Sequence, residues 1–169
     1  AILVDAEKKF LLDYGIKLDD KTEYPLRING KIDAYILSHA HLDHSGFAPA
    51  LYSNSYVEAY GTPPTIELTR LLVEDSIKIN KRKRLRQPFS KGDLRRFERA
   101  YTPCEYNTEI DVGAYTLSLH DAGHITGSSI TKIVDRRSGK TLVYTGDYKL
   151  EPQTLQKGAE VVKSDILIT

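Results

Sequence analysis

Residues 37–46 read LSHAHLDHSG and bring three histidines and one aspartate into the six positions from His39 to His44. They follow the apolar stretch IDAYIL, residues 32–37, which has the length and composition of a strand buried on both faces. Neutral imidazole and carboxylate groups are good ligands for zinc and similar divalent ions. Because the whole chain has only five histidines in 169 residues, a coincidental polar loop is a poor explanation. We therefore expect a metal site at the end of a buried strand.

The spacing inside this cluster favours more than one ion. His39 and His41 are two positions apart, whereas Asp43 and His44 are adjacent. Four ligands so close in sequence cannot easily bind one tetrahedral ion. The simpler geometry has alternate residues of the cluster binding two neighbouring ions. Gly46 supports this interpretation because a glycine lets the backbone approach such a site closely.

Two later loops provide further candidate ligands. His124 lies in HDAGHITGSS, a glycine-containing loop after the expected strand 115–119, and Asp147 lies in VYTGDYKLEP after another apolar strand. A carboxylate can bridge two ions, which suits Asp147. Asp13, in LLDYG, is interpreted as a buried carboxylate that orients the ligand loop, with a simple turn aspartate as the alternative. His120 falls on the polar face of its strand, and we expect it to support the site from outside or to lie at the surface.

The rest of the chain predicts an α+β domain in which two sheets pack together with helices on the outside. Thr62 and Pro63 begin a helix over 63–80, with Leu68, Leu71, Leu72 and Ile79 on one face. Ser90 and Asp93 resemble a capping box before a second helix that carries Leu94, Phe97 and Tyr101. The expected strands and hairpins are 2–4 with 10–12, 32–38, 57–61, 115–119, and a hairpin over 128–147 turned at 136–140.

Composition limits the class of protein. Charged residues make up 28% and hydrophobic ones 40%, and the single Cys104 excludes an internal disulfide framework. No apolar run approaches the roughly 18 residues needed to span a bilayer, and no signal-peptide pattern begins the chain. We therefore expect a soluble, cytoplasmic protein with no membrane partner.

Charge is unevenly distributed although the net charge is only +1. Residues 78–86, KINKRKRLR, hold six basic side chains and no acidic one. Lys81, Arg82, Lys83 and Arg84 are candidate nucleic-acid contacts, because basic clusters attract polyanions without sequence preference. A solvated helix end is the alternative interpretation.

Together the quoted motifs resemble the metallo-β-lactamase superfamily. HAHLDHSG, the histidine of DAGHITGSS and the aspartate of YTGDYKLEP are similar to its successive metal-binding motifs, and LLDYG is similar to its first motif. The segments HDAGHITGS and TGDYKLEP most resemble sequences of the nucleic-acid-processing β-CASP branch. That branch includes archaeal relatives of the endonuclease subunit of the cleavage and polyadenylation specificity factor, and ribonuclease J. The resemblance extends from about Ile2 to Thr169.

The resemblance implies a metallo-β-lactamase αββα sandwich and a ligand for each position. His39, His41 and His124 would hold one metal, Asp43 and His44 the second, and Asp147 would bridge them. The family's late histidine ligand and the β-CASP cap fall beyond Thr169. Residues 1–169 are therefore expected to form a partial metallo-β-lactamase domain without the cap or the C-terminal half of the fold.

The resemblance further implies a hydrolase that cleaves RNA phosphodiester bonds, as an endonuclease, a 5′-exonuclease or both, with two divalent ions, expected to be Zn²⁺. Asp43 would help to activate the attacking water. Single-stranded RNA is the expected substrate, DNA is left open, and a homodimer is expected for the longer protein. The alternatives are a thioester or lactone hydrolase, an inactive RNA-binding subunit and an inactive fragment. A di-iron oxidoreductase is disfavoured because His41 stands where those members carry a carboxylate.

Overall fold

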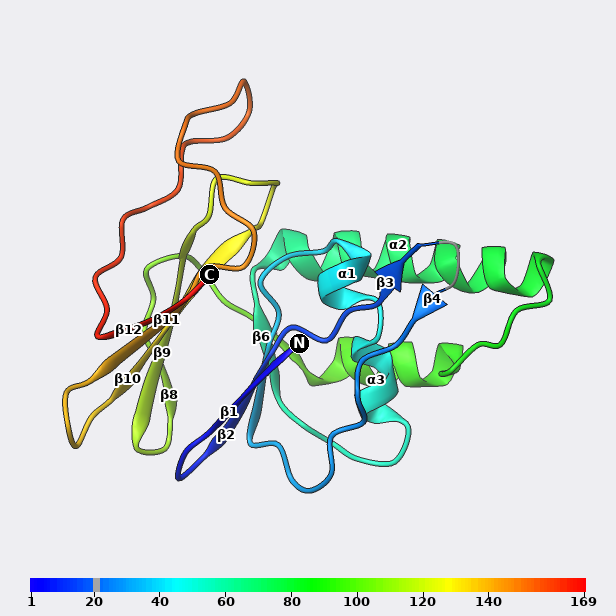
Figure 1. Ribbon diagram of the computed structural model, residues 1–169, viewed down its shortest axis with the longest axis horizontal. Helices are drawn as coiled ribbons and strands as arrows, with labels where there is room; N and C mark the ends of the chain where they lie inside the picture. Colours follow the sequence, from blue (N-terminus) through cyan, green and yellow to red (C-terminus); the bar gives the residue numbers. More distant parts are fainter. Residues whose placement is uncertain (20–21) are drawn as a thin grey trace.

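The computed structural model describes residues 1–19 and 22–169 and contains two five-stranded sheets packed face to face (Figure 1). In the first sheet the strand order is β1-β2-β5-β6-β7, with β1 antiparallel to β2 and the remaining neighbours parallel. Parallel strands end at the same edge of the sheet, so the loops that follow β2 and β5 are neighbours. The strands are β1 (Ile2–Asp5), β2 (Lys9–Leu12), β5 (Ala34–Ile36), β6 (Ala59–Gly61) and β7 (Tyr101–Pro103).

The second sheet has the order β12-β11-β10-β9-β8 and is antiparallel except for the β11–β12 pair. Its β10–β11 hairpin turns over residues 136–140, as the sequence predicts. Both sheets are thus mixed, and the predicted sandwich of two packed mixed sheets is confirmed. The strands are β8 (Ile110–Val112), β9 (Tyr115–Asp121), β10 (Ser129–Asp135), β11 (Thr141–Tyr144) and β12 (Ile166–Ile168).

The helices cover the outer face of the first sheet (Figure 1). The 20-residue α2 and the shorter α3 lie side by side, and α3 packs on the 3₁₀ helix η1. A short β3–β4 ribbon lies beside α1. The bounds are α1 (Leu42–Ser45), η1 (Ala48–Tyr52), α2 (Pro63–Arg82), α3 (Lys91–Ala100), β3 (Lys17–Leu18) and β4 (Thr22–Glu23).

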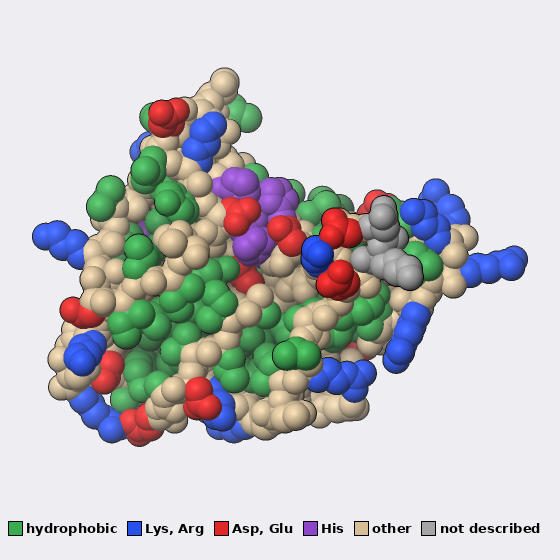
Figure 2. Space-filling model, viewed as in Figure 1, with side chains coloured by type: hydrophobic (Ala, Val, Ile, Leu, Met, Phe, Trp, Pro, Cys, Tyr) green, Lys and Arg blue, Asp and Glu red, His purple; other side chains and the backbone are tan. Residues whose placement is uncertain are grey.

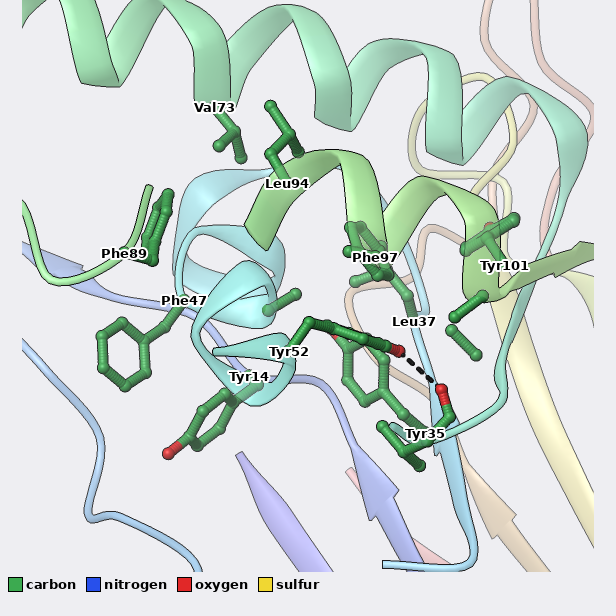
Figure 3. Packing of buried hydrophobic residues seen from close by; sticks show 14 of the residues in the cluster. Tyr14, Tyr35, Leu37, Phe47, Tyr52, Val73, Phe89, Leu94, Phe97 and Tyr101 are labelled. Carbon is green, nitrogen blue, oxygen red and sulfur yellow. Dashed lines mark hydrogen bonds between the residues drawn. The ribbon is translucent and has the colours of Figure 1, made fainter. Parts of the chain in front are cut away.

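Strand alternation divides the interior into two cores. Tyr35 points toward the helices, where it lies beside Tyr52 and Phe97 (Figure 3), and Leu11 belongs to the same cluster. Their neighbours, such as Phe10, point the other way and pack against the second sheet. Because successive strand residues face opposite sides, a central strand buried on both faces must be apolar throughout, as β5 is.

Two sequence predictions about the helices are wrong in detail. The helix over 63–80 exists, but Thr65, Thr69 and Val73 form its buried face. The side of α2 that carries Leu71 is turned to solvent, with Leu71 58% exposed. Hydrophobicity selected the wrong face because this helix buries two small threonines and packs Ile66 and Ile77 against the core, which the periodicity of leucines could not reveal. Tyr101 does not extend the second helix, since extended backbone there begins β7.

The segment between β11 and β12 covers part of the outer face of the second sheet. Ala159 and Val162 pack on a small cluster formed by Ala122, Ile130 and Val143. Within the described residues, every helix falls short of the length and apolarity that crossing a membrane requires.

Candidate metal centre

Three loops that leave strand ends, together with the short helix α1, meet at one edge of the sandwich. His39 and His41 lie between β5 and α1, His124 lies in the β9–β10 loop, and Asp147 follows β11. Asp43 and His44 are part of α1 itself. Figure 2 shows the histidines gathered at this edge with acidic side chains beside them. Residues separated by about a hundred positions in the sequence are therefore neighbours in space.

Three imidazoles and a carboxylate form a compact donor group. Nε2 of His39 lies 3.1 Å from Nδ1 of His41, which lies 3.3 Å from Nε2 of His124. Oδ2 of Asp147 lies 3.9 Å from Nε2 of His39 and 3.7 Å from Nε2 of His124. For ligand bonds of about 2.0–2.1 Å, tetrahedral neighbours would be about 3.4 Å apart. These four side chains could hold one metal ion.

The hydrogen atoms of the imidazoles also fit a cation between them. The hydroxyl of Ser38 donates to Asp13, so Nδ1–H of His39 donates to Oγ of Ser38 at 3.0 Å. A neutral His39 then presents a bare Nε2 toward His41. Nδ1 of His41 carries either one hydrogen or one lone pair. It can therefore form a hydrogen bond with Nε2 of His39 or with Nε2 of His124, but not with both. A metal ion would accept a lone pair from each of the three nitrogens.

Asp147 turns its second oxygen toward another histidine. Its Oδ1 lies 3.3 Å from Nε2 of His44, and this nitrogen lies 3.7 Å from Oδ2 of Asp43. Asp147 and Asp43 are 47% and 63% exposed, so solvent and ligands can reach both carboxylates. In the described part of the chain, their ionic partners are all histidines, and no lysine or arginine forms an ion pair with them. The centre thus offers concentrated negative charge, as a cation site requires.

Asp13 is buried beneath the centre and orients one of its histidines. Its Oδ2 accepts hydrogen bonds from Nδ1 of His44 at 2.7 Å, Oγ of Ser38 at 2.6 Å and Oη of Tyr144 at 2.7 Å, and its Oδ1 accepts from the backbone N–H of Ser38 at 2.7 Å. A proton held on Nδ1 of His44 leaves Nε2 free to face Asp43 and Asp147. Asp13 has a positive φ of 53°, a conformation that aspartate tolerates better than most residues.

The electrostatic surroundings favour the neutral, ligand form of His39 and His124 and the ionised form of Asp13. Burial lowers the pKa of His39 to about 3, and burial also lowers the pKa of His124, so both imidazoles are neutral at pH 7. Burial opposes ionisation of Asp13, but hydrogen bonds and charge from His44, with hydrogen bonds from Ser38, outweigh it and lower its pKa. For His44, burial is outweighed by the hydrogen bond and negative charge of Asp13, which raise its pKa.

Close backbone packing places α1 against this centre. Gly15 lies so near the carbonyl of Asp43 that a Cβ at this position would overlap it. Backbone hydrogen bonds from Tyr14 to His44 and from Ile16 to Leu42 hold the loop after β2 against α1. The same kind of contact joins the two sheets, because the N–H of Ser129 donates to the carbonyl of Ser38 at 2.8 Å.

His120 and the basic residues 81–84 lie away from the donor group, and two residues that support it were not predicted from the sequence. His120 is outside the donor group, and its Nδ1 lies 3.3 Å from Oε2 of Glu160. Residues 81–84 lie at the far end of α2 from the centre (Figure 1). Sequence analysis did not single out Ser38 or Tyr144, which both donate to Asp13. Each of these two polar residues lies at the end of a buried strand, which could have marked it as a candidate. Nothing in the sequence, however, indicates which carboxylate its hydroxyl group contacts.

Comparison with known proteins places this geometry in a family. Residues 2–166 match the metallo-beta-lactamase superfamily domain. The chain is 35% identical over 165 residues to Probable RNase MJ4 of Methanocaldococcus jannaschii, covering 95% of this chain and 38% of that protein. It is 32% identical over 161 residues to RNase aCSPSF2 of Saccharolobus solfataricus, covering 93% and 32%. It is 37% identical over 161 residues to transcription termination factor FttA of Methanothermobacter thermautotrophicus, covering 89% and 25%.

The chain therefore spans 25% to 38% of the length of these curated relatives. Among solved structures, a protein of unknown function from Enterococcus faecalis V583 superposes with a TM-score of 0.54 at 19% identity, over 87% of this chain and 39% of that one. This likeness supports the fold. The match over nearly the whole sequence, together with the histidine and aspartate group at the edge of the sandwich, shows that the chain belongs to the metallo-beta-lactamase superfamily.

Proposed function

We propose that the protein is a ribonuclease that hydrolyses phosphodiester bonds of single-stranded RNA at a centre of two zinc ions. The observation that carries this proposal is the orientation of Asp147. Its Oδ2 faces His39 and His124, whereas its Oδ1 faces His44. A bridging ligand is expected to have this arrangement, in which the two oxygens of one carboxylate face different sets of histidines.

The proposed ligand sets follow from these contacts. His39, His41 and His124 would hold one ion, and Asp147 would share it with a second ion. Asp43 and His44 would hold the second ion, with Asp13 fixing the tautomer of His44 through Nδ1. The mixture of imidazole and carboxylate donors suits zinc.

A pair of divalent ions held in this way supplies Lewis-acid polarisation of a phosphodiester and activation of a water molecule near neutral pH. The side chains supply the remaining functions. Asp43 is exposed beside His44 and would accept a proton from the attacking water at a carboxylate oxygen. Asp13 is buried and accepts four hydrogen bonds, so its part is to hold His44 in place.

RNA is the proposed substrate because two of the relatives described above are named RNases. The stretches that are 35% and 32% identical cover 95% and 93% of this chain. No feature of the described centre specifically favours a small thioester or lactone over a phosphodiester.

The test is cleavage of end-labelled single-stranded RNA by metal-loaded protein, with and without chelator, alongside DNA and a thioester. We expect RNA cleavage that chelator abolishes and added zinc restores, with two zinc ions bound per chain by elemental analysis. His41→Ala should lose metal and activity together, whereas His120→Ala, which alters a histidine outside the donor group, should retain both. Zinc-dependent thioester turnover without RNA cleavage would refute the substrate assignment, and one ion per active chain would refute the dinuclear centre.

A further inference from the structure

A cluster of cations lies at the end of α2 farthest from the candidate centre. We call residues 81–86, KRKRLR, the basic tip. All six are exposed, and among the ion pairs of residues 1–19 and 22–169 none involves the five cations of this segment. Unpaired cations on a surface attract polyanions and release their counterions on contact.

The basic tip has a defined shape. The N–H of Lys83 donates to the carbonyl of Ile79, and the N–H of Leu85 donates to the carbonyl of Asn80, each at 2.9 Å. The side chain of Asn80 then donates to Oε1 of Gln87 at 2.8 Å and closes the turn. Arg84 has a positive φ of 54° within it. The cations are thus displayed from an ordered turn that continues the helix.

The other end of α2 is attached to the candidate centre. Oγ1 of Thr62 and Oγ1 of Thr65 donate to the carbonyl of Gly127 at 2.6 and 2.9 Å. Gly127 belongs to the β9–β10 loop that carries His124. Because α2 has 20 residues, its rise of about 1.5 Å per residue puts the basic tip about 30 Å from this anchor. Figure 2 shows the histidines near one end of α2 and Lys and Arg side chains projecting beyond the other.

The surroundings of the centre itself carry the opposite charge. Asp43 and Asp147 lie at its mouth, and the nearby β3–β4 ribbon pairs Lys17 with Asp19 and Glu23, at 2.9 and 3.5 Å. The one lysine of this described group is therefore already neutralised. A polyanion would gain little from these side chains and much from the distant basic tip.

Resting on the proposed function, we infer that the basic tip is a second RNA-binding site that holds the substrate backbone about 30 Å from the cleaved bond. The helix α2 acts as a rigid spacer between the two sites. At roughly 3.4 Å per nucleotide of a stacked strand, about 30 Å corresponds to about nine nucleotides. Short RNAs can therefore occupy the centre without touching the basic tip, whereas longer ones engage both.

Binding tests this inference independently of hydrolysis. The affinity for a labelled single-stranded RNA of about 20 nucleotides is measured by fluorescence anisotropy in chelator, across a range of salt. Each lost phosphate contact lowers the log–log salt slope by about 0.7 for a single strand. Arg82→Gln/Lys83→Gln should therefore lower the slope by about 1.4 and weaken binding roughly tenfold at physiological salt. The charge-matched control Lys140→Gln/Lys163→Gln alters two exposed lysines outside α2 and should change neither.

Catalysis provides the length test. We expect Arg82→Gln/Lys83→Gln to lower kcat/KM for the long RNA through KM, while hydrolysis of a dinucleotide and of bis(p-nitrophenyl) phosphate stays unchanged. Unchanged binding of long RNA, or equal loss in the control variant, would overturn the second site. A proportionate loss on the dinucleotide would overturn its separation from the centre. Failure of the unaltered protein to bind metal or cleave any diester would instead count against the proposed function, and the anisotropy result would still decide the basic tip.

Discussion

Replacing Asp13 by asparagine should weaken both the fold and the metal site. Asparagine has nearly the same size and tolerates the positive φ at this position, so the change removes charge and one acceptor without straining the backbone. In either orientation of the asparagine side chain, its NH₂ group faces another hydrogen-bond donor, because both carboxylate oxygens of Asp13 accept hydrogen bonds in the native protein.

The size of the effect follows from these contacts. Breaking a buried charge pair costs about 3–5 kcal/mol, and one unsatisfied buried donor costs about 1–3 kcal/mol. Since the two penalties overlap, we expect a loss of about 3 kcal/mol in the free energy of unfolding. For a chain of this length that lowers Tm by roughly 6–12 °C. Freed from Asp13, His44 can move its proton to Nε2, so metal affinity should fall about 10–100-fold.

The assay compares thermal unfolding in chelator with metal affinity from competition dialysis. Asp93→Asn is the matched control, because Asp93 is also buried but caps α3 through Ser90 and pairs with Arg96, away from the centre. It should lower stability by about 1 kcal/mol and leave metal affinity unchanged. If Asp13→Asn left metal affinity unchanged, or if both variants lowered it equally, the orienting role of Asp13 would be wrong.

Three further predictions concern the same region. Asp43→Asn should abolish RNA cleavage while the circular dichroism spectrum remains that of the folded chain; retained turnover would exclude Asp43 from water activation. Gly15→Ala should destabilise the protein by about 1–3 kcal/mol and reduce bound metal, because the new methyl group displaces α1 at Asp43, and an unchanged Tm would contradict this. The pKa of Asp13 is lowered in the folded state, so its stabilising effect is present above its unfolded value near 3.8 and is lost as pH falls through the folded pKa. Urea unfolding in chelator should therefore show the stabilities of wild type and Asp13→Asn converging as the pH falls below 3.8, and a constant gap would refute the assignment.

Much of this protein could be predicted from local patterns. Residues 34–37, AYIL, are apolar throughout because β5 is covered on both sides, and the polar cluster after them marks the strand's exit from the core. The capping box at Ser90 begins α3, and the turn over 136–140 closes a hairpin. In each case the decisive interactions join residues close in sequence or follow from simple alternation, so short stretches were sufficient.

Tertiary structure decided which residues meet. The sequence by itself determined that histidines and carboxylates follow buried strands. The two oxygens of Asp147 face different histidines only because the packing of two different sheets brings the ends of β5 and β11 to one edge. The contacts of Tyr144 and Ser38 with Asp13, and the burial of the threonine face of α2, depend on the same packing. Such contacts join residues up to 131 positions apart, a separation over which no local periodicity carries information.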